Sequence, residues 1–543
     1  MALVLLVCSI AQAQPVYDWA KSAGSITAEF VHGITSDAAG NVYVTGEFNG
    51  TVDFDPGPGT QILTATGADI FICKFDASGN LVWVKSINQE GGYSIAVDVA
   101  GNVYTTGLFG GTIDFDPGPG TYPLTSAGSS DIFVSKLDAS GNFVWAKAMG
   151  GANYEQGNSI AVDAAGNVYT TGITDGGDFD PGPGTQLLTG RTFISKLDAA
   201  GNYVWAASLA AANGYSIAVD ATGNVYTTGY FANASADFDP GPGTYNVPYG
   251  GNADIFISKL DASGNFVWAK SMGGANDDVG GSLALDASGN IHITGAFQNS
   301  VDFDPGPGTT TLTTSTNVSD IFVSKLDASG NLLWAKSMGS SSVDEGVSLA
   351  VDAVGNVYTV GLFNGTVDFD PGVGTQNLTA ASGTSDVFVS KLDASGNYVW
   401  AYQLGNGSDS EGYWYITVNG NDNVYLTGDF SNTVDFDPGA GTKNLSAAGG
   451  TDVFIAHLVP NPLPLTLLQF RAENNGSAIQ LQWQTTQEEN TASFIIERSI
   501  GRKAFAAIGS VAAVNNSLKS NYGFNDTKPL DGTGFYRLKM IDI

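Results

Sequence analysis

Two aspartates separated by one phenylalanine recur seven times along this chain of 543 residues. The first copy reads DFDPGPGT from Asp53, and only the sixth residue differs, in the last two copies. Side chains alternate in an extended strand, so both carboxylates point one way and the phenylalanine points the other. Two carboxylates beside a glycine-rich turn that offers carbonyl oxygens suit a hard cation, and calcium is the candidate. The candidate calcium ligands are Asp53, Asp55, Asp114, Asp116, Asp178, Asp180, Asp237, Asp239, Asp302, Asp304, Asp368, Asp370, Asp435 and Asp437.

A purely structural role explains the same residues. Proline presets φ for a turn, glycine tolerates a positive φ, and aspartate side chains accept backbone N–H groups. The motif has no third acidic position and no closing glutamate, so it is not an EF-hand loop. The sequence therefore leaves two interpretations open: calcium ligands, or aspartates that cap a turn.

A second set of acidic residues lies five positions before the first apolar residue of each expected inner strand. Six of the seven positions are acidic, and the seventh is Ala212. We expect these acids to surround the mouth of a central channel, on the same face as the turn aspartates. Crowded negative charge there would attract cations or a basic partner, whereas the alternative is a solvated rim. The six are Glu29, Glu90, Glu155, Asp278, Asp344 and Glu411.

The elements that position these acids repeat with the same period. Tryptophan recurs at 19, 83, 145, 205, 268, 334 and 400. One unit, from Ser94, contains the runs SIAVD, NVYTTG, DIFVSKL and NFVWAKA. Their β-branched and aromatic residues favour strands, and the Gly-Asn pairs between them favour tight turns. Seven antiparallel four-stranded units predict an all-β fold, a seven-bladed β-propeller.

The two ends of residues 15–459 complement each other. The seventh copy stops after its third strand, DVFIAHL, whereas the chain begins with VYDWAKSAG, which matches a fourth strand. We therefore expect the N-terminal strand to close the ring and remove two exposed sheet edges. An open solenoid is the alternative.

The repeated GNVYTTG, DIFVSKLDASGN and tryptophan runs resemble the SBBP-type bacterial β-propeller repeat. The resemblance covers residues 16–459 and implies the propeller fold, with no assigned chemistry. After a proline-rich linker, 460–464, residues 465–543 alternate like the strands of a sandwich, with Trp483 in its core. This segment resembles the fibronectin type III-like module of type IX-secreted proteins, here truncated, so type IX export is what the resemblance implies.

Composition and charge narrow the classes of partner and the cellular location that we expect. The formal net charge of −32 disfavours nucleic acid and anionic membranes as partners. Residues 1–13 read as a signal peptide that lacks the usual basic n-region, which suggests a start further upstream. No later run is long and apolar enough to cross a membrane. Cys73 then has no cysteine partner, and Ser135 and Ser195 occupy its place in other copies. We expect a monomer, secreted or attached to the outer cell surface.

The acidic residues follow the repeat, whereas an active site normally breaks such symmetry. The three histidines replace tyrosine or lysine of other copies, and we assign no catalytic residue. The sequence favours a non-enzymatic binding or scaffold protein that holds a protein or glycan through its acidic, calcium-loaded face. The alternative is a hydrolase or lyase of the polysaccharide class, with its site at the channel mouth.

Overall fold

A computed structural model describes most of the chain. The described residues are 14–89, 91–381, 385–405, 414–420, 422–439, 441–460, 465–486, 488, 491–500, 505–514, 518–530 and 534–542. The expected signal peptide, 1–13, and residues 461–464 of the linker lie outside them. Two compact units are present, one spanning Val16–Val459 and the other including Pro460–Ile543. All the described elements are strands, and none of these residues form a helix suited to crossing a bilayer.

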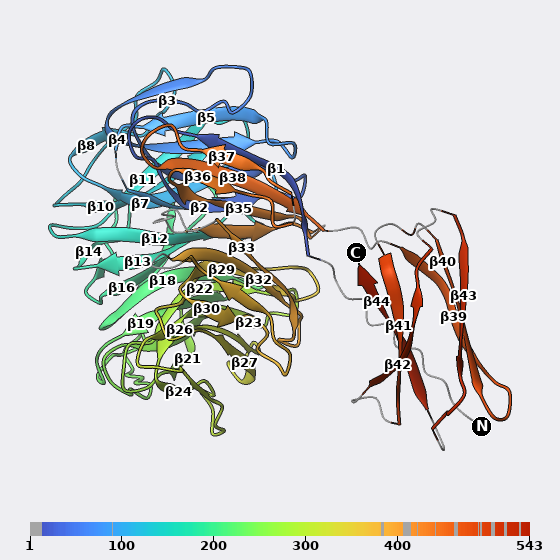
Figure 1. Cartoon of the computed structure of the whole chain (residues 1–543). Coiled ribbons are helices and arrows are strands. Elements are labelled where there is room, and N and C mark those ends of the chain that lie inside the picture. Colours follow the sequence, from blue (N-terminus) through green and yellow to red (C-terminus); the bar gives the residue numbers. More distant parts are fainter. Residues whose placement is uncertain are drawn as a thin grey trace. The chain divides into compact units, whose positions relative to one another are not determined.

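The first unit contains seven antiparallel four-stranded sheets, numbered I to VII by their first strands (Figure 1). Sheet I comprises β2 (Phe30–Ser36), β3 (Val42–Asp53), β4 (Ile62–Phe75) and β5 (Leu81–Ile87). Sheet II comprises β6 (Gly92–Val97), β7 (Val103–Phe109), β10 (Asp131–Leu137) and β11 (Phe143–Met149). Sheet III comprises β12 (Glu155–Val162), β13 (Val168–Thr174), β16 (Thr192–Leu197) and β17 (Tyr203–Leu209). Sheet IV comprises β18 (Ala212–Val219), β19 (Val225–Phe231), β20 (Asp254–Leu260) and β21 (Phe266–Met272).

The remaining sheets repeat this order, except that sheet VII takes its fourth strand from the start of the chain. Sheet V comprises β22 (Val279–Leu285), β23 (Ile291–Gln298), β26 (Ser319–Leu326) and β27 (Leu332–Met338). Sheet VI comprises β28 (Glu345–Val351), β29 (Val357–Phe363), β32 (Asp386–Leu392) and β33 (Tyr398–Leu404). Sheet VII comprises β34 (Tyr415–Val418), β35 (Val424–Phe430), β38 (Asp452–Val459) and β1 (Val16–Ala23).

Short hairpins carry most of the DFD motifs between the second and third strands of a sheet. They pair β8 (Thr112–Asp114) with β9 (Pro123–Thr125), β14 (Gly177–Asp178) with β15 (Leu187–Leu188), β24 (Ser300–Asp302) with β25 (Thr311–Thr313), β30 (Thr366–Asp368) with β31 (Asn377–Thr379), and β36 (Thr433–Asp435) with β37 (Asn444–Ser446). In sheet I the same hairpin continues β3 and β4, where Asp53 pairs with Ile62.

The DASGN turns explain how neighbouring sheets attach. In the first of these turns, Asp76 accepts the N–H groups of Ser78 and Asn80, each at 2.9 Å. Gly79 has a φ of 75°, and a Cβ on it would lie 2.9 Å from the Trp19 ring. Glycine is required here by both the backbone conformation and the close approach of the indole.

The indoles of five of the seven repeated tryptophans also donate a hydrogen bond to the turn of the next sheet. Trp83 of sheet I bonds to the Ala139 carbonyl in sheet II at 3.2 Å, and Trp334 of sheet V bonds to Ala394 in sheet VI at the same distance. Trp19 of sheet VII bonds to Ala77 in sheet I at 3.1 Å. The boundary between sheets VII and I therefore uses the same contact as the internal boundaries.

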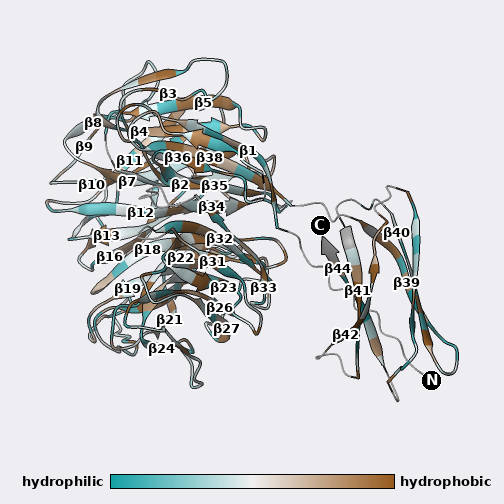
Figure 2. Cartoon of the chain, in the orientation of Figure 1, coloured by the Kyte–Doolittle hydropathy of each residue, from teal (hydrophilic) through white to brown (hydrophobic). Residues whose placement is uncertain are grey.

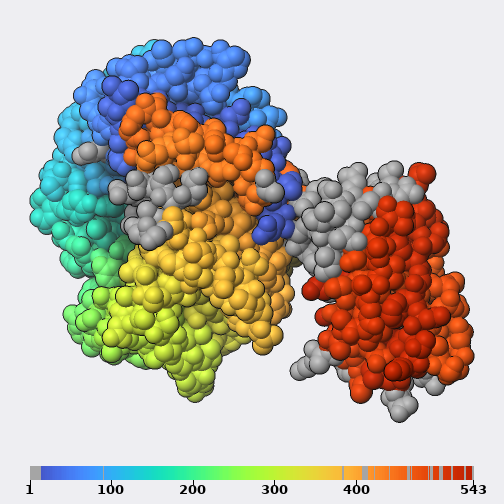
Figure 3. All heavy atoms as spheres, in the orientation of Figure 1, coloured from blue at the N-terminus to red at the C-terminus, as the bar shows by residue number. Residues whose placement is uncertain are grey.

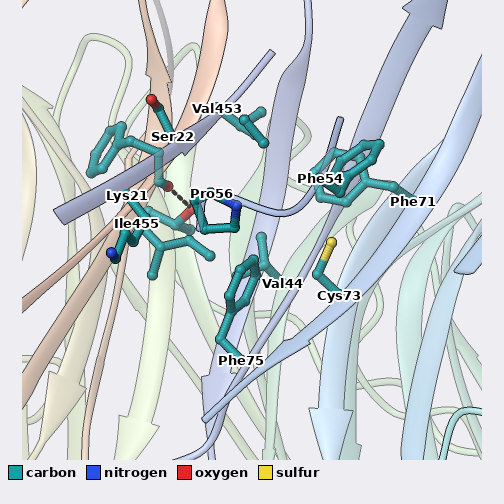
Figure 4. A pocket seen from close by; sticks show the side chains of 13 residues that line it. Lys21, Ser22, Val44, Phe54, Pro56, Phe71, Cys73, Phe75, Val453 and Ile455 are labelled. Atoms are coloured by element: carbon teal, nitrogen blue, oxygen red, sulfur yellow. Dashed lines mark hydrogen bonds between the residues drawn. The ribbon is translucent and has the colours of Figure 1, made fainter. Parts of the chain in front are cut away.

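Both ends of the first unit meet in sheet VII. Strand β1 pairs antiparallel with β38, with Ala20 opposite Ala456. In Figure 3 the blue N-terminal atoms and the orange atoms of the last repeat lie side by side. A cavity of about 20 Å³ at this boundary is lined by Ala23 of β1, Phe71 of β4 and Val453 of β38 among others, so three distant segments share one core (Figure 4). The first strands also contact one another in order from sheet I to VII, and β34 of sheet VII contacts β2 of sheet I.

The second unit has two three-stranded sheets around one core. One sheet contains β39 (Thr466–Asn474), β40 (Ile479–Thr486) and β43 (Ser520–Asp526), and the other contains β42 (Ala506–Ala512), β41 (Thr491–Ser499) and β44 (Phe535–Asp542). Apolar and polar residues alternate along β40, as the hydropathy colours show (Figure 2). Trp483 is buried against Phe494 and Tyr522, as expected for a core residue.

Candidate functional site

The first aspartate of each DFD motif caps its own turn. In the first motif, Asp53 Oδ1 accepts the N–H groups of Asp55 at 3.1 Å and Gln61 at 2.8 Å. The motif that begins at Asp302 repeats these contacts with Asp304 at 3.0 Å and Thr310 at 2.8 Å. The carboxylate thus fixes both ends of the loop, which is the structural role that the sequence offered as an alternative to calcium.

The second aspartate explains the glycines of the motif. Asp55 Oδ1 accepts the Gly57 N–H at 2.8 Å. A Cβ on Gly59 would lie 2.1 Å from Asp55 Oδ2, so no larger residue fits there without displacing the carboxylate. Phe54 between the two aspartates is buried in the core of sheet I, as predicted.

These contacts engage one oxygen of each turn carboxylate. Within the described ranges, no group of three or more His, Cys, Asp or Glu side chains is arranged to hold a metal. All seven motifs use the Oδ1 atoms of both aspartates to accept backbone N–H groups. Calcium at these fourteen residues stays a prediction.

The acids expected around a channel mouth are buried where the structure describes them. Glu29, Glu155, Asp278 and Asp344 each have 0% exposure, so the alternative of a solvated rim is wrong for these four. Each accepts the N–H of the residue four positions earlier, as Asp278 does from Gly274 at 2.8 Å. Glu90 and Glu411, the other two expected members, lie outside the described residues.

A second buried acid, which the sequence reasoning missed, lies beside each of these four. It is the aspartate at the start of the third strand of the preceding sheet, as Asp254 is for Asp278. The four are Asp131, Asp254, Asp320 and Asp452, each exposed by 5% or less. The sequence signal for these acids was the aspartate that recurs before IFVSKL. It was missed because an aspartate there is also typical of the start of an ordinary strand.

Burial shifts the ionisation of these carboxyl groups. Loss of solvation raises the pKa of Asp254 to about 6, and that of Asp278 and Asp320 to about 7. The negative charge of Asp254 raises the pKa of Asp278 further, and Asp344 acts likewise on Asp320. Backbone N–H donors oppose the shift at Asp278.

A cavity of about 910 Å³ is lined by residues from the first strands of all seven sheets. Its lining is mixed, with tyrosine rings, amides and hydroxyl groups, and it includes Tyr93, Tyr215, Tyr415, Gln156, Asn158 and Gln298. Two carboxylates, Asp277 and Glu345, belong to the lining as well. The cavity is large enough for a small ligand or one chain of a polymer.

The three histidines do not gather in this cavity. His32 lines it and lies 3.5 Å from Glu47, whereas His292 is buried 3.3 Å from Asp286. His457 pairs with Asp18 at 2.9 Å and stacks on Tyr425. They occupy separate sheets, consistent with their reading as isolated replacements.

Comparisons with known proteins agree with this architecture. Residues 144–180 match the family model of the SBBP beta-propeller repeat. The matched segment includes β12 and β13, with the turn up to Asp180. Over this segment the chain is thus similar to β-propeller repeat proteins, and its described strands form an all-β, antiparallel architecture.

Two curated proteins are similar over longer stretches. The WD repeat-containing protein L264 of Acanthamoeba polyphaga mimivirus is 24% identical over 76% of this chain and 36% of its own length. The regulatory protein FlaEY of Caulobacter vibrioides is 27% identical over 48% of this chain and 28% of its own length. The chain thus spans about a third of the length of these relatives.

Proposed function

We propose that this protein is a non-enzymatic binding or scaffold module, secreted or held at the outer cell surface. Its seven sheets would close into a seven-bladed propeller, and its ligand would enter the central cavity. The cavity lining carries the proposal, because every sheet contributes to it. A site built by all repeats fits recognition of an extended or symmetric ligand better than chemistry at one bond.

Closure of the ring is supported by three features at the boundary between sheets VII and I. Strand β1 completes sheet VII, Trp19 bonds to the Ala77 carbonyl, and β34 contacts β2. In a closed ring each sheet still has an outer edge strand, so binding in the central cavity would use the side chains that line it.

The lining favours a neutral polar ligand. Tyrosine rings offer flat apolar faces with a polar tip, and glutamine and asparagine side chains both donate and accept hydrogen bonds. These groups fit a glycan, and a polar peptide is the other candidate. The acidic face that the sequence suggested contributes less, because the four described acids of the expected ring are buried.

Export and the nature of the second unit belong to the same proposal. The apolar leader of residues 1–13 supports secretion. The six strands of the second unit and its buried Trp483 support a fibronectin type III-like module, which would present the propeller at a surface.

A binding experiment tests the central cavity. The full chain is screened on an array of glycans and cell-wall fragments, and each hit is measured by calorimetry. We expect Tyr93→Ala with Tyr215→Ala to weaken binding at least tenfold, because both rings line the cavity. Tyr122→Ala, in the hairpin between β8 and β9, is the control and should bind like the native chain. Equal binding by all three proteins would reject the cavity as the site.

A hydrolase or lyase is the second candidate, and one observation favours it. Asp277 and Glu345 bring two carboxylates to the lining from neighbouring sheets V and VI, which breaks the repeat symmetry. Paired carboxylates serve as acid and base in glycoside hydrolysis. Release of reducing ends from a bound glycan, abolished by Glu345→Gln, would favour this candidate over a binding module.

A further inference from the structure

The boundaries between neighbouring sheets bring two acidic chain segments together. At the boundary of sheets IV and V, the Asp278 N–H donates to the Ala253 carbonyl at 2.7 Å, directly before Asp254. The same bond joins Glu29 to Thr451 at 2.8 Å, Glu155 to Ser130 at 3.1 Å, and Asp344 to Ser319 at 2.9 Å. Each of these four boundaries therefore places a carboxylate from the third strand of one sheet beside a carboxylate from the start of the next sheet.

The two carboxylates face the same small volume. At the boundary of sheets II and III, a Cβ on Gly150 would lie 2.9 Å from Asp131 Oδ1 and 2.9 Å from Glu155 Oε2. At the boundary of sheets IV and V, a Cβ on Gly273 would lie 2.3 Å from Asp254 Cγ. A glycine is thus needed where the acids converge.

One oxygen at each boundary has no hydrogen-bond partner. Asp278 uses both oxygens, accepting N–H groups from Gly274 at 2.8 Å and Gln298 at 2.9 Å. Asp254 Oδ1 is buried with no partner. The corresponding unpartnered atoms elsewhere are Oδ1 of Asp320, Oδ1 of Asp452 and Oε1 of Glu155. A buried oxygen without a donor or a cation is costly, so each boundary needs a further group.

No basic side chain supplies that group. In the described part of the chain, none of these eight acids forms an ion pair with lysine, arginine or histidine. Two buried carboxylates repel each other unless a proton or a cation lies between them. All the available ligands are oxygen atoms, which a hard cation prefers over a transition metal.

The boundary of sheets III and IV lacks both acids and can be compared with the four boundaries that have them. There the third strand begins with Thr192 instead of aspartate, and the next sheet begins with Ala212 instead of an acid. Both carboxylates are lost together at this boundary, although the surrounding strands are retained. Joint loss indicates that the two acids act as a pair, because separate loop caps have no reason to disappear at the same place.

We propose that a calcium ion binds at four boundaries between sheets and bridges the carboxylates of Asp452 and Glu29, Asp131 and Glu155, Asp254 and Asp278, and Asp320 and Asp344. Each ion would link the third strand of one sheet to the first strand of the next. These sites are distinct from the DFD turns, and they do not depend on the ligand of the central cavity. Glu90 and Glu411 lie outside the described residues, so the boundaries next to Asp69 and Asp386 are left out.

Calcium content measures the proposal directly. The full chain is stripped with EDTA at pH 8, reloaded with calcium, passed through a desalting column and analysed by elemental analysis. We expect at least four calcium ions per chain, and one fewer in the double variant Asp254→Asn, Asp278→Asn. The matched control, Asp237→Asn with Asp239→Asn, changes the DFD turn of the same sheet and should retain the native number. A chain that retains no calcium, or a control that loses one ion while the boundary variant loses none, would overturn the proposal.

A gain-of-site variant covers the case in which the boundary variant fails to fold. Thr192→Asp with Ala212→Asp restores the missing pair between sheets III and IV. We expect one additional calcium ion and a higher midpoint of thermal unfolding in calcium than in EDTA. An unchanged calcium content in this folded variant would contradict the proposal, and would instead favour buried pairs that share a proton.

Discussion

Trp19 Nε1 donates a hydrogen bond to the Ala77 carbonyl at 3.1 Å, and this contact joins the start of the chain to the turn of sheet I. Because Trp19 belongs to the strand that completes sheet VII, the same bond also connects the last sheet to the first. Its counterparts at other boundaries, such as Trp83 to Ala139 at 3.2 Å, lie between consecutive sheets. The contact is thus the repeat's own means of attachment, used once more where the chain ends meet.

Removing this hydrogen bond should weaken the unit by a modest amount. Trp19→Phe keeps most of the apolar area but loses the indole donor, so we expect a loss of about 1 kcal/mol in the free energy of unfolding. Trp19→Ala also empties the space beside Gly79, and we expect about 3–5 kcal/mol. Urea unfolding followed by tryptophan fluorescence measures both, with Trp83→Phe as the matched control at an internal boundary. If Trp19→Ala is as stable as the native chain, the two ends do not meet in this way.

The turn aspartates should act through stability and not through calcium. Asp237 Oδ1 accepts the N–H groups of Asp239 at 3.0 Å and Tyr245 at 2.8 Å. Asp237→Ala leaves both donors without this partner, so we expect a loss of about 2 kcal/mol. Thermal melts in EDTA and in excess calcium test the cause. A loss of stability that appears only in calcium would identify the turn as a metal site instead.

His292 makes the unit sensitive to mild acid. It replaces the tyrosine found in other copies, and burial lowers its pKa from 6.5 to about 4. The unfolded chain therefore takes up a proton between pH 6.5 and 4 that the folded chain does not, and stability falls as pH falls through this range. We expect His292→Tyr to lose less stability between pH 7 and 4.5 than the native chain, as measured by thermal unfolding at each pH. An identical pH dependence in both proteins would show that His292 is not the group responsible.

The buried acid pairs have the opposite pH dependence. The pKa of Asp254 is raised to about 6, and the pKa values of Asp278 and Asp320 to about 7, so the folded chain holds protons that the unfolded chain releases. In EDTA, this contribution to stability is present at acidic pH and is lost as pH rises through about 6–7. We expect calcium to raise the unfolding midpoint more at pH 8 than at pH 5. Equal calcium effects at both pH values would argue against binding at ionised pairs.

The repeat made the strands and their order predictable from the sequence. The tryptophan spacing and the Gly-Asn turns set the four-stranded units, and the two incomplete ends indicated that β1 belongs with β38. Burial of Phe54 followed from strand alternation alone. These features are local or repeated, so each copy supports the others.

The sites were less predictable, because their properties depend on which segments meet. Glu29 and Asp278 read as exposed rim acids, but the preceding sheet covers them completely. Asp254 was not predicted as a site residue, because nothing in its own strand shows that its side chain lies beside an acid 24 positions later. The cavity also depends on tyrosines that are not conserved in every copy, such as Tyr93 and Tyr215. Only the assembled sheets reveal these neighbours.

Closure of the ring is the claim on which the central cavity and the calcium site of Asp452 and Glu29 both depend, and a cross-strand disulfide tests it most directly. Ala20 of β1 lies opposite Ala456 of β38, and both are small and buried. With Cys8 and Cys73 changed to serine, Ala20→Cys together with Ala456→Cys should oxidise to an intramolecular disulfide, identified by mass spectrometry of the linked peptides. The control pair Ala20→Cys with Ala146→Cys, which places the second cysteine in sheet II, should stay reduced. A folded Ala20→Cys, Ala456→Cys protein whose thiols stay free under oxidising conditions would contradict the closed ring.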